Sequence, residues 1–123
     1  MAAALAAAAN LGWRAAFPSL TGQPVPQAID AVSVGIASVL PVLLAAGIYL
    51  LLARGFAIAT PLYILGSIAV AAASCVATLT PTLPDGAPAP SSFPTLTIPM
   101  HLMAGVAAAF VTPLIVVIGT RRR

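Results

Sequence analysis

The chain has 123 residues, of which 61% are hydrophobic and only 6% are charged. A typical soluble domain is about 25% charged, so this composition excludes an ordinary water-soluble fold. The net charge of +3 comes from arginines that are too few and too clustered to form a nucleic-acid surface. We expect one all-α domain over residues 1–123, with the lipid bilayer as its main solvent.

The first half of the chain predicts two membrane helices joined by a loop. Residues 1–17 are rich in alanine, and Pro18 is expected to end this helix because proline has no amide hydrogen to donate. A loop with further prolines and a glycine follows over 18–29. The second helix covers 30–53, where Pro41 predicts a kink of the kind that membrane helices tolerate.

The second half predicts two more membrane helices. The third helix covers 61–80 and begins with a proline, which suits a first helical turn. Repeated prolines over 81–98 predict a long loop outside the hydrocarbon. The fourth helix covers 99–120, is uncharged apart from His101, and should kink at Pro113. The fold expected is therefore an integral membrane four-helix bundle with a long proline-rich outer loop.

The arginines predict the orientation of this bundle. Arg54 ends the second helix, and Arg121, Arg122 and Arg123 follow the fourth. Arginine and lysine accumulate on the cytoplasmic side of membrane proteins. An even number of helices then places both termini in the cytoplasm. The alanine-rich, lysine-free composition is typical of bacterial genomes rich in GC, so we expect a multi-pass protein of the bacterial cytoplasmic membrane.

Four polar residues are expected to gather under the outer loops. Arg14 ends the first helix, Asp30 begins the second, His101 begins the fourth, and Asn10 lies about one turn deeper. Because charges near the membrane interior are usually paired, we expect an ion pair between Arg14 and Asp30. The cluster has two interpretations, a structural clasp between helices and a titratable or ligand-binding site built on His101. The clasp is the simpler of the two.

Small residues recur at helical spacing on the third and fourth helices. In a bilayer, helices associate through close contact of small side chains and through polar pairs. We therefore expect packing seams, and the alternative is that these faces line a cavity. The residues are Ser67, Ala71 and Ser74 on the third helix, and Gly105 and Thr112 on the fourth.

The sequence contains no recognisable catalytic set. One histidine and one cysteine are too few for an ordinary protein metal site, so we expect no metal and no enzyme activity. Axial ligation of a haem or pigment by His101 is the single cofactor alternative.

Three short motifs carry a resemblance to a known family. They are Asn10 in an alanine-rich first helix, Ser74 followed by Thr80-Pro81, and the run Met100-His101-Leu102. This pattern resembles a family of small four-helix membrane proteins from actinobacteria and their relatives, to which no activity is assigned. The resemblance implies the four-helix count and singles out Asn10, Ser74, Pro81 and His101.

These observations favour a non-enzymatic subunit or partner of a larger membrane complex. Its expected partners are the lipid bilayer and other membrane chains or a second copy of itself. The alternative is a small transporter or ligand-binding membrane protein with a polar site near His101.

Overall fold

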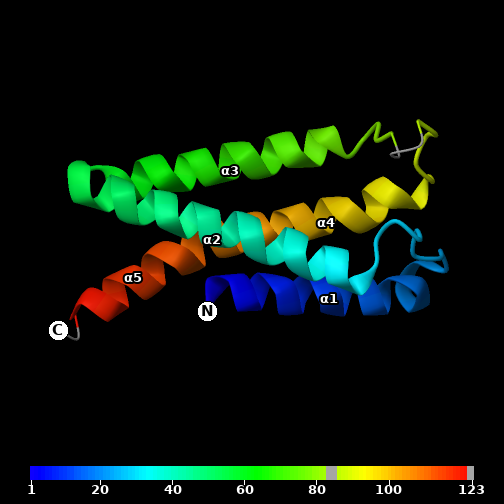
Figure 1. Ribbon diagram of the computed structural model, residues 1–123, viewed down its shortest axis with the longest axis horizontal. Helices are drawn as coiled ribbons and strands as arrows, with labels where there is room; N and C mark the ends of the chain where they lie inside the picture. Colours follow the sequence, from blue (N-terminus) through cyan, green and yellow to red (C-terminus); the bar gives the residue numbers. More distant parts are fainter. Residues whose placement is uncertain (83–85, 122–123) are drawn as a thin grey trace.

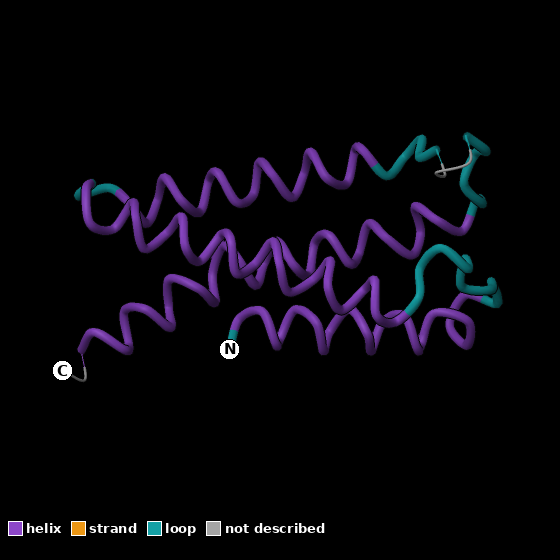
Figure 2. The backbone as a smooth tube through the Cα atoms, viewed as in Figure 1, coloured by secondary structure: helices purple, strands orange, loops and turns teal. Residues whose placement is uncertain are grey.

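The computed structural model describes residues 1–82 and 86–121, and helices make up most of them (Figures 1 and 2). No strand is present in this part of the chain, only an isolated antiparallel bridge between Thr82 and Pro88. A π-helix, η1, joins α4 and α5 into one continuous rod, which makes four helical rods in all. The elements are α1 (Ala2–Thr21), α2 (Ala31–Gly55), α3 (Ala59–Ala77), α4 (Ser92–Val106), η1 (Ala107–Val111) and α5 (Thr112–Arg121).

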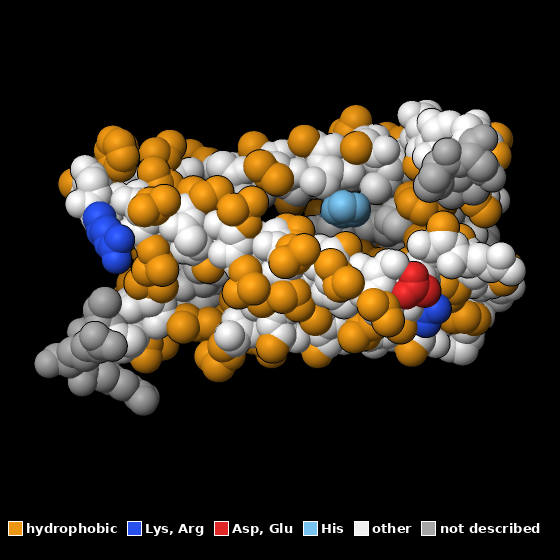
Figure 3. Space-filling view, viewed as in Figure 1, with side chains coloured by type: hydrophobic (Ala, Val, Ile, Leu, Met, Phe, Trp, Pro, Cys, Tyr) orange, Lys and Arg blue, Asp and Glu red, His pale blue; other side chains and the backbone are white. Residues whose placement is uncertain are grey.

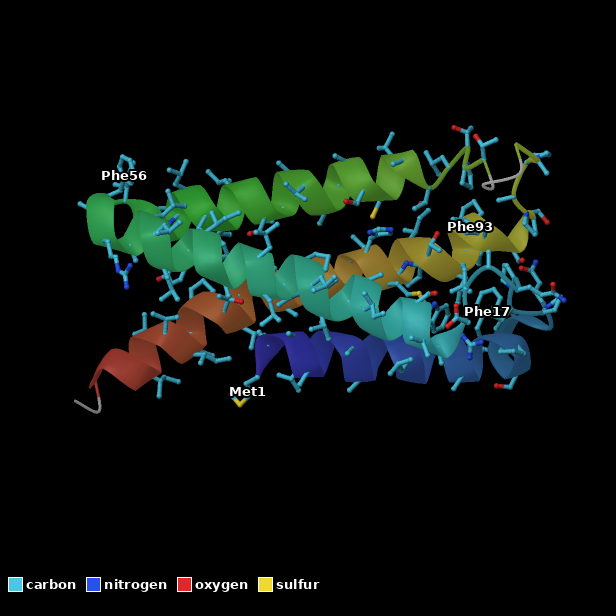
Figure 4. All side chains as sticks on the ribbon, viewed as in Figure 1. Met1, Phe17, Phe56 and Phe93 are labelled. Carbon is cyan, nitrogen blue, oxygen red and sulfur yellow. The ribbon has the colours of Figure 1, made fainter. Side chains whose placement is uncertain are left out.

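The rod formed by α4, η1 and α5 is central, because α1, α2 and α3 all pack against it. Figure 1 shows the turn between α2 and α3 at the same end as the chain's C-terminus. The loops before α2 and before α4 lie at the opposite end. Figure 4 marks these two ends by single residues, with Phe56 at the first and both Phe17 and Phe93 at the second. Arg54 therefore shares an end with α5, as the sequence predicts.

Three helices of the described chain are long and apolar enough to cross a membrane. They are α2, which continues through Pro41, then α3, and the rod over Ser92–Gly119. The first helix, α1, is not among them, although the sequence analysis counts it as a membrane helix. Its first alanines pack against Val42, close to the middle of α2, and against the π-helix.

The N-terminus lies partway along the bundle, and its expected position in the cytoplasm stays a prediction. Figure 1 shows the N-terminus beside the middle of α2, not at the end that holds the α2–α3 turn. The helix α1 runs along only part of the length of α2.

Pro18 does not end α1, which continues to Thr21. Two hydroxyl groups near Pro18 bond within the helix, since Ser19 donates to the Ala16 carbonyl at 2.8 Å and Thr21 donates to the Phe17 carbonyl at 2.7 Å. The helix ends at Gly22, whose φ of 69° lies in the left-handed region that glycine adopts most readily. The loop predicted over 18–29 is correspondingly shorter.

The fourth helix begins at Ser92 rather than at residue 99, so the predicted outer loop over 81–98 is also too long. Pro94 stands in the first turn, where backbone amides have no partner within the helix and a missing N–H costs no hydrogen bond. Pro99 lies inside the helix, which continues through it. Thr97 donates its hydroxyl proton to the Phe93 carbonyl at 2.8 Å.

A π-helix over Ala107–Val111 lies just before Pro113, where the sequence predicts a kink. Proline cannot donate to the preceding turn, and a widened turn redistributes the remaining hydrogen bonds. The backbone N–H of Thr112 accordingly bonds to the first carbonyl of the π-helix, five residues earlier. Tyr63 of α3 donates its hydroxyl proton to the carbonyl of Ala108 at 3.0 Å, which ties the widened turn to its neighbour.

The predicted seam between the third and fourth helices contains one very close contact. A Cβ atom on Gly105 would lie 2.5 Å from the Cβ of Ala71, so α3 and α4 approach closely because this residue is glycine. Ser67 and Ser74 are half-buried, and Ser74 donates to the Val70 carbonyl within its own helix.

We predict that Gly105→Ala lowers the stability of the protein in detergent micelles, because the added methyl group forces α3 away from α4. Overpacking of this kind costs about 1–3 kcal/mol. The melting temperature should fall in Gly105→Ala and recover in the double variant Gly105→Ala with Ala71→Gly. Gly66→Ala on α3 is the matched control, since no atom lies within 4 Å of its added Cβ. An unchanged melting temperature in Gly105→Ala would contradict the close contact.

Candidate functional site

A polar cavity of about 230 Å³ lies between α1, α2 and α4, in the half of the molecule away from Arg54. It lies beside the first two turns of α2, within the stretches of α2 and α4 that are apolar enough to cross a membrane. Most of its lining is apolar, including Phe93 and Met100. The polar lining residues are Asn10, Ser33, Ser38, Thr97 and His101.

Asn10 is deeply buried at this cavity, with 3% of its surface exposed. Its amide nitrogen donates to the Ser38 hydroxyl at 2.8 Å, and that hydroxyl donates its one proton to the Val34 carbonyl at 2.6 Å. Ser38 can therefore only accept from Asn10, which fixes the orientation of the amide. The Asn10 Oδ1 atom is left buried without a hydrogen-bond partner.

The other hydroxyl groups of the cavity also use their protons within the chain. Ser33 donates to the carboxylate of Asp30, and Thr97 donates to the Phe93 carbonyl. Each serine and threonine hydroxyl carries one proton and two lone pairs. What these side chains can still offer to a guest is therefore lone pairs, so the cavity is biased toward hydrogen-bond acceptors.

His101 is half-buried at the edge of this cavity. Figure 3 shows it beside a hollow between α2 and α3. Neither imidazole nitrogen makes a hydrogen bond with the part of the chain that the structure describes. As a neutral imidazole it carries one donor and one acceptor, so it can offer both to a guest.

Arg14 and Asp30 do not form the ion pair that the sequence predicts. Arg14 Nε donates to the carbonyl of Ile29 at 2.7 Å. Asp30 instead caps α2, where its Oδ1 accepts from the backbone N–H groups of Val32 at 2.8 Å and Ser33 at 3.0 Å. The predicted cluster is thus divided, with Asn10 and His101 in the cavity and the two charged residues outside it.

The cap determines the protonation behaviour of Asp30, which is fully exposed at the start of α2. Hydrogen bonds from the Ser33 side chain and then from the Ser33 and Val32 backbone hold the pKa of this carboxyl below its usual value of 3.8. Each bond favours the charged form of the acid. Asp30 is therefore an anion at neutral pH, and its role is to begin the helix whose first two turns form one wall of the cavity.

Trp13 fixes α1 to the opposite wall, which the sequence does not reveal. Its indole N–H donates to the Leu96 carbonyl on α4 at 3.0 Å, and its ring meets Phe17 edge to face with centroids 5.7 Å apart. Phe17 and Leu96 are fully buried in an apolar cluster that also includes Met100, one of the residues that line the cavity. Trp13 therefore packs on the apolar cluster that contributes Met100 to the cavity.

A second, larger cavity of about 350 Å³ lies between α1 and α4 and is lined only by apolar side chains. It offers no group that could select a ligand by hydrogen bonding. Among the described residues, no group of three or more His, Cys, Asp or Glu side chains is close enough to hold a metal ion. The polar cavity is therefore the candidate site.

Comparison with protein-family models, with curated proteins and with solved structures finds no match to this chain. The resemblance to the actinobacterial membrane family thus stays a hypothesis based on Asn10, Ser74, Pro81 and His101. The structure does place two of these residues, Asn10 and His101, in the same cavity. Ser33, Ser38 and Thr97 were missed, although the two serines are the only polar side chains in the first turns of the apolar α2 segment.

We predict that the stability of the protein decreases at acid pH through Asp30. Because the pKa of this carboxyl is lowered in the folded state, its contribution is complete above the unfolded pKa of about 3.9 and is lost as the pH falls through the folded value. Melting temperatures in detergent, measured from neutral pH down to about pH 2.5, should show this loss. Asn also caps helices well, so Asp30→Asn should fold and should lose less stability on acidification. Identical pH curves for the two proteins would contradict the capping role.

Proposed function

We propose that the protein is a membrane-embedded binding protein that takes a small lipid-soluble molecule into the polar cavity. The observation that carries this proposal is the buried Oδ1 atom of Asn10, which has no hydrogen-bond partner beside a cavity of about 230 Å³. An unsatisfied buried polar group costs about 1–3 kcal/mol. A bound molecule that satisfied this atom would recover that free energy, whereas an apolar residue at position 10 would avoid the loss altogether.

The surroundings of the cavity favour entry from the side. Ser33 and Ala37 line the cavity, belong to the apolar α2 helix and are exposed. If α2 crosses the membrane, these residues face lipid and not water. A ligand that partitions into the bilayer would then reach the cavity directly, which favours a lipid-soluble ligand over a water-soluble one. The proposed role is binding or transport without chemical conversion.

The orientation of the protein is part of this proposal. Arg54 is exposed at the end of α2, and α5 ends at Arg121 at the same end of the molecule. The side chains of Arg121, Arg122 and Arg123 lie outside the described residues. We place this end in the bacterial cytoplasm by the positive-inside rule. The polar cavity then lies toward the outer leaflet.

A second candidate function is that of a subunit in a larger membrane complex. One observation favours it. Only 11% of the most apolar 18-residue stretch of α3 is buried within the chain. Another membrane chain packed on α3 would cover this surface, although lipid alone would satisfy its apolar side chains. Co-purification of a stoichiometric partner in mild detergent would support this function, and a protein that purifies alone would count against it.

We predict that at least one member of a series of compounds with ten-carbon tails and different head groups binds the purified protein saturably. Trp13 is the only tryptophan, so its fluorescence in lipid nanodiscs reports on the cavity. Ala37→Leu should abolish the response by filling the cavity mouth. Ala72→Leu, a substitution at an exposed alanine on α3, is the matched control and should leave the response intact. Failure of every compound, or equal responses from both variants, would count against the proposed function.

We also predict the sidedness of the protein in intact bacterial cells. In a Cys75→Ser background, a cysteine introduced at Gly86 should react with a thiol reagent that cannot cross membranes. A cysteine at Gly55, next to Arg54, should react only after the membrane is permeabilised. The reverse pattern would show that the orientation is inverted.

A further inference from the structure

The hydrogen-bonding state of the polar cavity specifies the kind of molecule that fits it. This inference rests on the proposed function and concerns the chemistry of the ligand's head group. It follows from counting which protons and lone pairs the lining side chains have already used.

The first step is the orientation of the Asn10 amide. Ser38 donates to the Val34 carbonyl at 2.6 Å, so its oxygen must accept the proton of Asn10 Nδ2 at 2.8 Å. The opposite orientation would place a carbonyl oxygen against a hydroxyl whose proton is directed elsewhere. The unpartnered end of the amide is therefore the oxygen, which can only accept hydrogen bonds.

The second step concerns the other polar groups of the lining. Ser33 donates to Asp30, and Thr97 donates to the Phe93 carbonyl at 2.8 Å, so neither hydroxyl has a proton left for a guest. His101 can both donate and accept, and Asn10 Nδ2 keeps a second N–H besides the one that it donates to Ser38. A guest without a donor would leave Asn10 Oδ1 unsatisfied, whereas a guest with an O–H group would complete its hydrogen bonding.

The third step excludes a permanently cationic guest. The cavity lining contains no carboxylate, and the exposed Asp30 lies outside it with its carboxylate committed to the cap of α2. Arg14, whose Nε bonds to the adjacent Ile29 carbonyl, adds a positive charge at the same end of the molecule. A cation would lose its hydration without gaining an opposite charge inside the cavity, which is strongly unfavourable.

The volume of the cavity limits how much of a ligand it can enclose. Pockets that enclose a whole drug-sized ligand usually measure about 300–1,000 Å³. At about 230 Å³, this cavity suits the head group of a ligand better than a complete amphipathic molecule. Its exposed rim at Ala28 and Ala37 lets an alkyl tail extend into surrounding lipid.

We propose that the polar cavity binds the neutral, hydroxyl-bearing head group of a lipid-soluble alcohol or phenol, whose O–H donates to Asn10 Oδ1. The oxygen of the same hydroxyl can accept a proton from His101. The alkyl part of the ligand remains in the bilayer.

A matched set of three probes tests this proposal in nanodiscs through Trp13 fluorescence. Decanol carries the O–H donor, decyl methyl ether has the same oxygen without the proton, and decyltrimethylammonium carries a permanent charge. We expect saturable binding of decanol at least about tenfold tighter than that of the ether, the ratio that corresponds to one hydrogen bond of ordinary strength. The ammonium compound should bind more weakly than decanol.

Asn10→Leu tests the acceptor itself. It should weaken decanol binding about tenfold and abolish the preference for decanol over the ether. The ligand-free variant should still fold, because removal of the buried unsatisfied Oδ1 atom offsets the loss of the hydrogen bond to Ser38. A purely structural role for Asn10 would instead weaken the binding of decanol and of the ether equally. Ser74→Ala, which removes a hydroxyl bonded only within α3, is the control and should change neither quantity.

The outcomes separate the ligand class from the proposed function. Saturable binding of the ether or the ammonium compound at least as tight as that of decanol, still blocked by Ala37→Leu, would overturn the alcohol assignment and leave the binding function standing. Decanol affinity unchanged in Asn10→Leu would overturn the role of Asn10. Absence of saturable binding by all three probes, with water alone in the cavity, would overturn the alcohol assignment.

Discussion

Three side-chain donors on one helix hold α1 to the rest of the protein. Asn10 donates to Ser38 on α2, Trp13 to a carbonyl on α4, and Arg14 to the carbonyl of Ile29 just before α2 begins. Between helices in a lipid environment, apolar contact provides little net driving force, so polar contacts and close packing matter more. These bonds position α1 as one wall of the polar cavity. Without them the cavity would have no closed side.

The same arrangement explains why the cavity is chemically one-sided. Local hydrogen bonds within α2 and α4 consume the hydroxyl protons of Ser38 and Thr97, because a serine or threonine in a helix readily donates to a carbonyl one turn earlier. Each such bond leaves lone pairs and no proton on the open side of the hydroxyl. Asn10 adds an acceptor of the same kind. A preference for donors thus arises from ordinary helix geometry, without any charged residue in the cavity.

Several parts of this structure could be predicted from the sequence because they follow from composition along the chain. The helices α2 and α3 are near their expected positions, and the interruption before Pro113 is present as a π-helix. Predictions based on proline alone were less accurate. Pro18, Pro94 and Pro99 all lie within helices, and Pro94 stands in a first turn, where the missing amide costs no hydrogen bond.

The expected pairing of Arg14 with Asp30 illustrates a different limit. Opposite charges are visible in a sequence, whereas the carbonyl that Arg14 uses and the two backbone amides that Asp30 accepts from become apparent only in three dimensions. The sequence places Asn10 and His101 near each other because the number of residues between each one and the end of its helix can be counted. The hydroxyls of Ser33, Ser38 and Thr97 were not, since their role depends on which face of each helix meets α1.

The π-helix also sets the rotational phase of the chain's last segment. One widened turn advances the backbone by an extra residue, so everything after Val111 is rotated by about 100° relative to an uninterrupted α-helix. With that offset, Thr112 faces inward and is 3% exposed. In a regular helix the same residue would point about a quarter of a circle away. The inward-facing positions of α5 are therefore offset by one residue from those that an uninterrupted continuation of α4 would give.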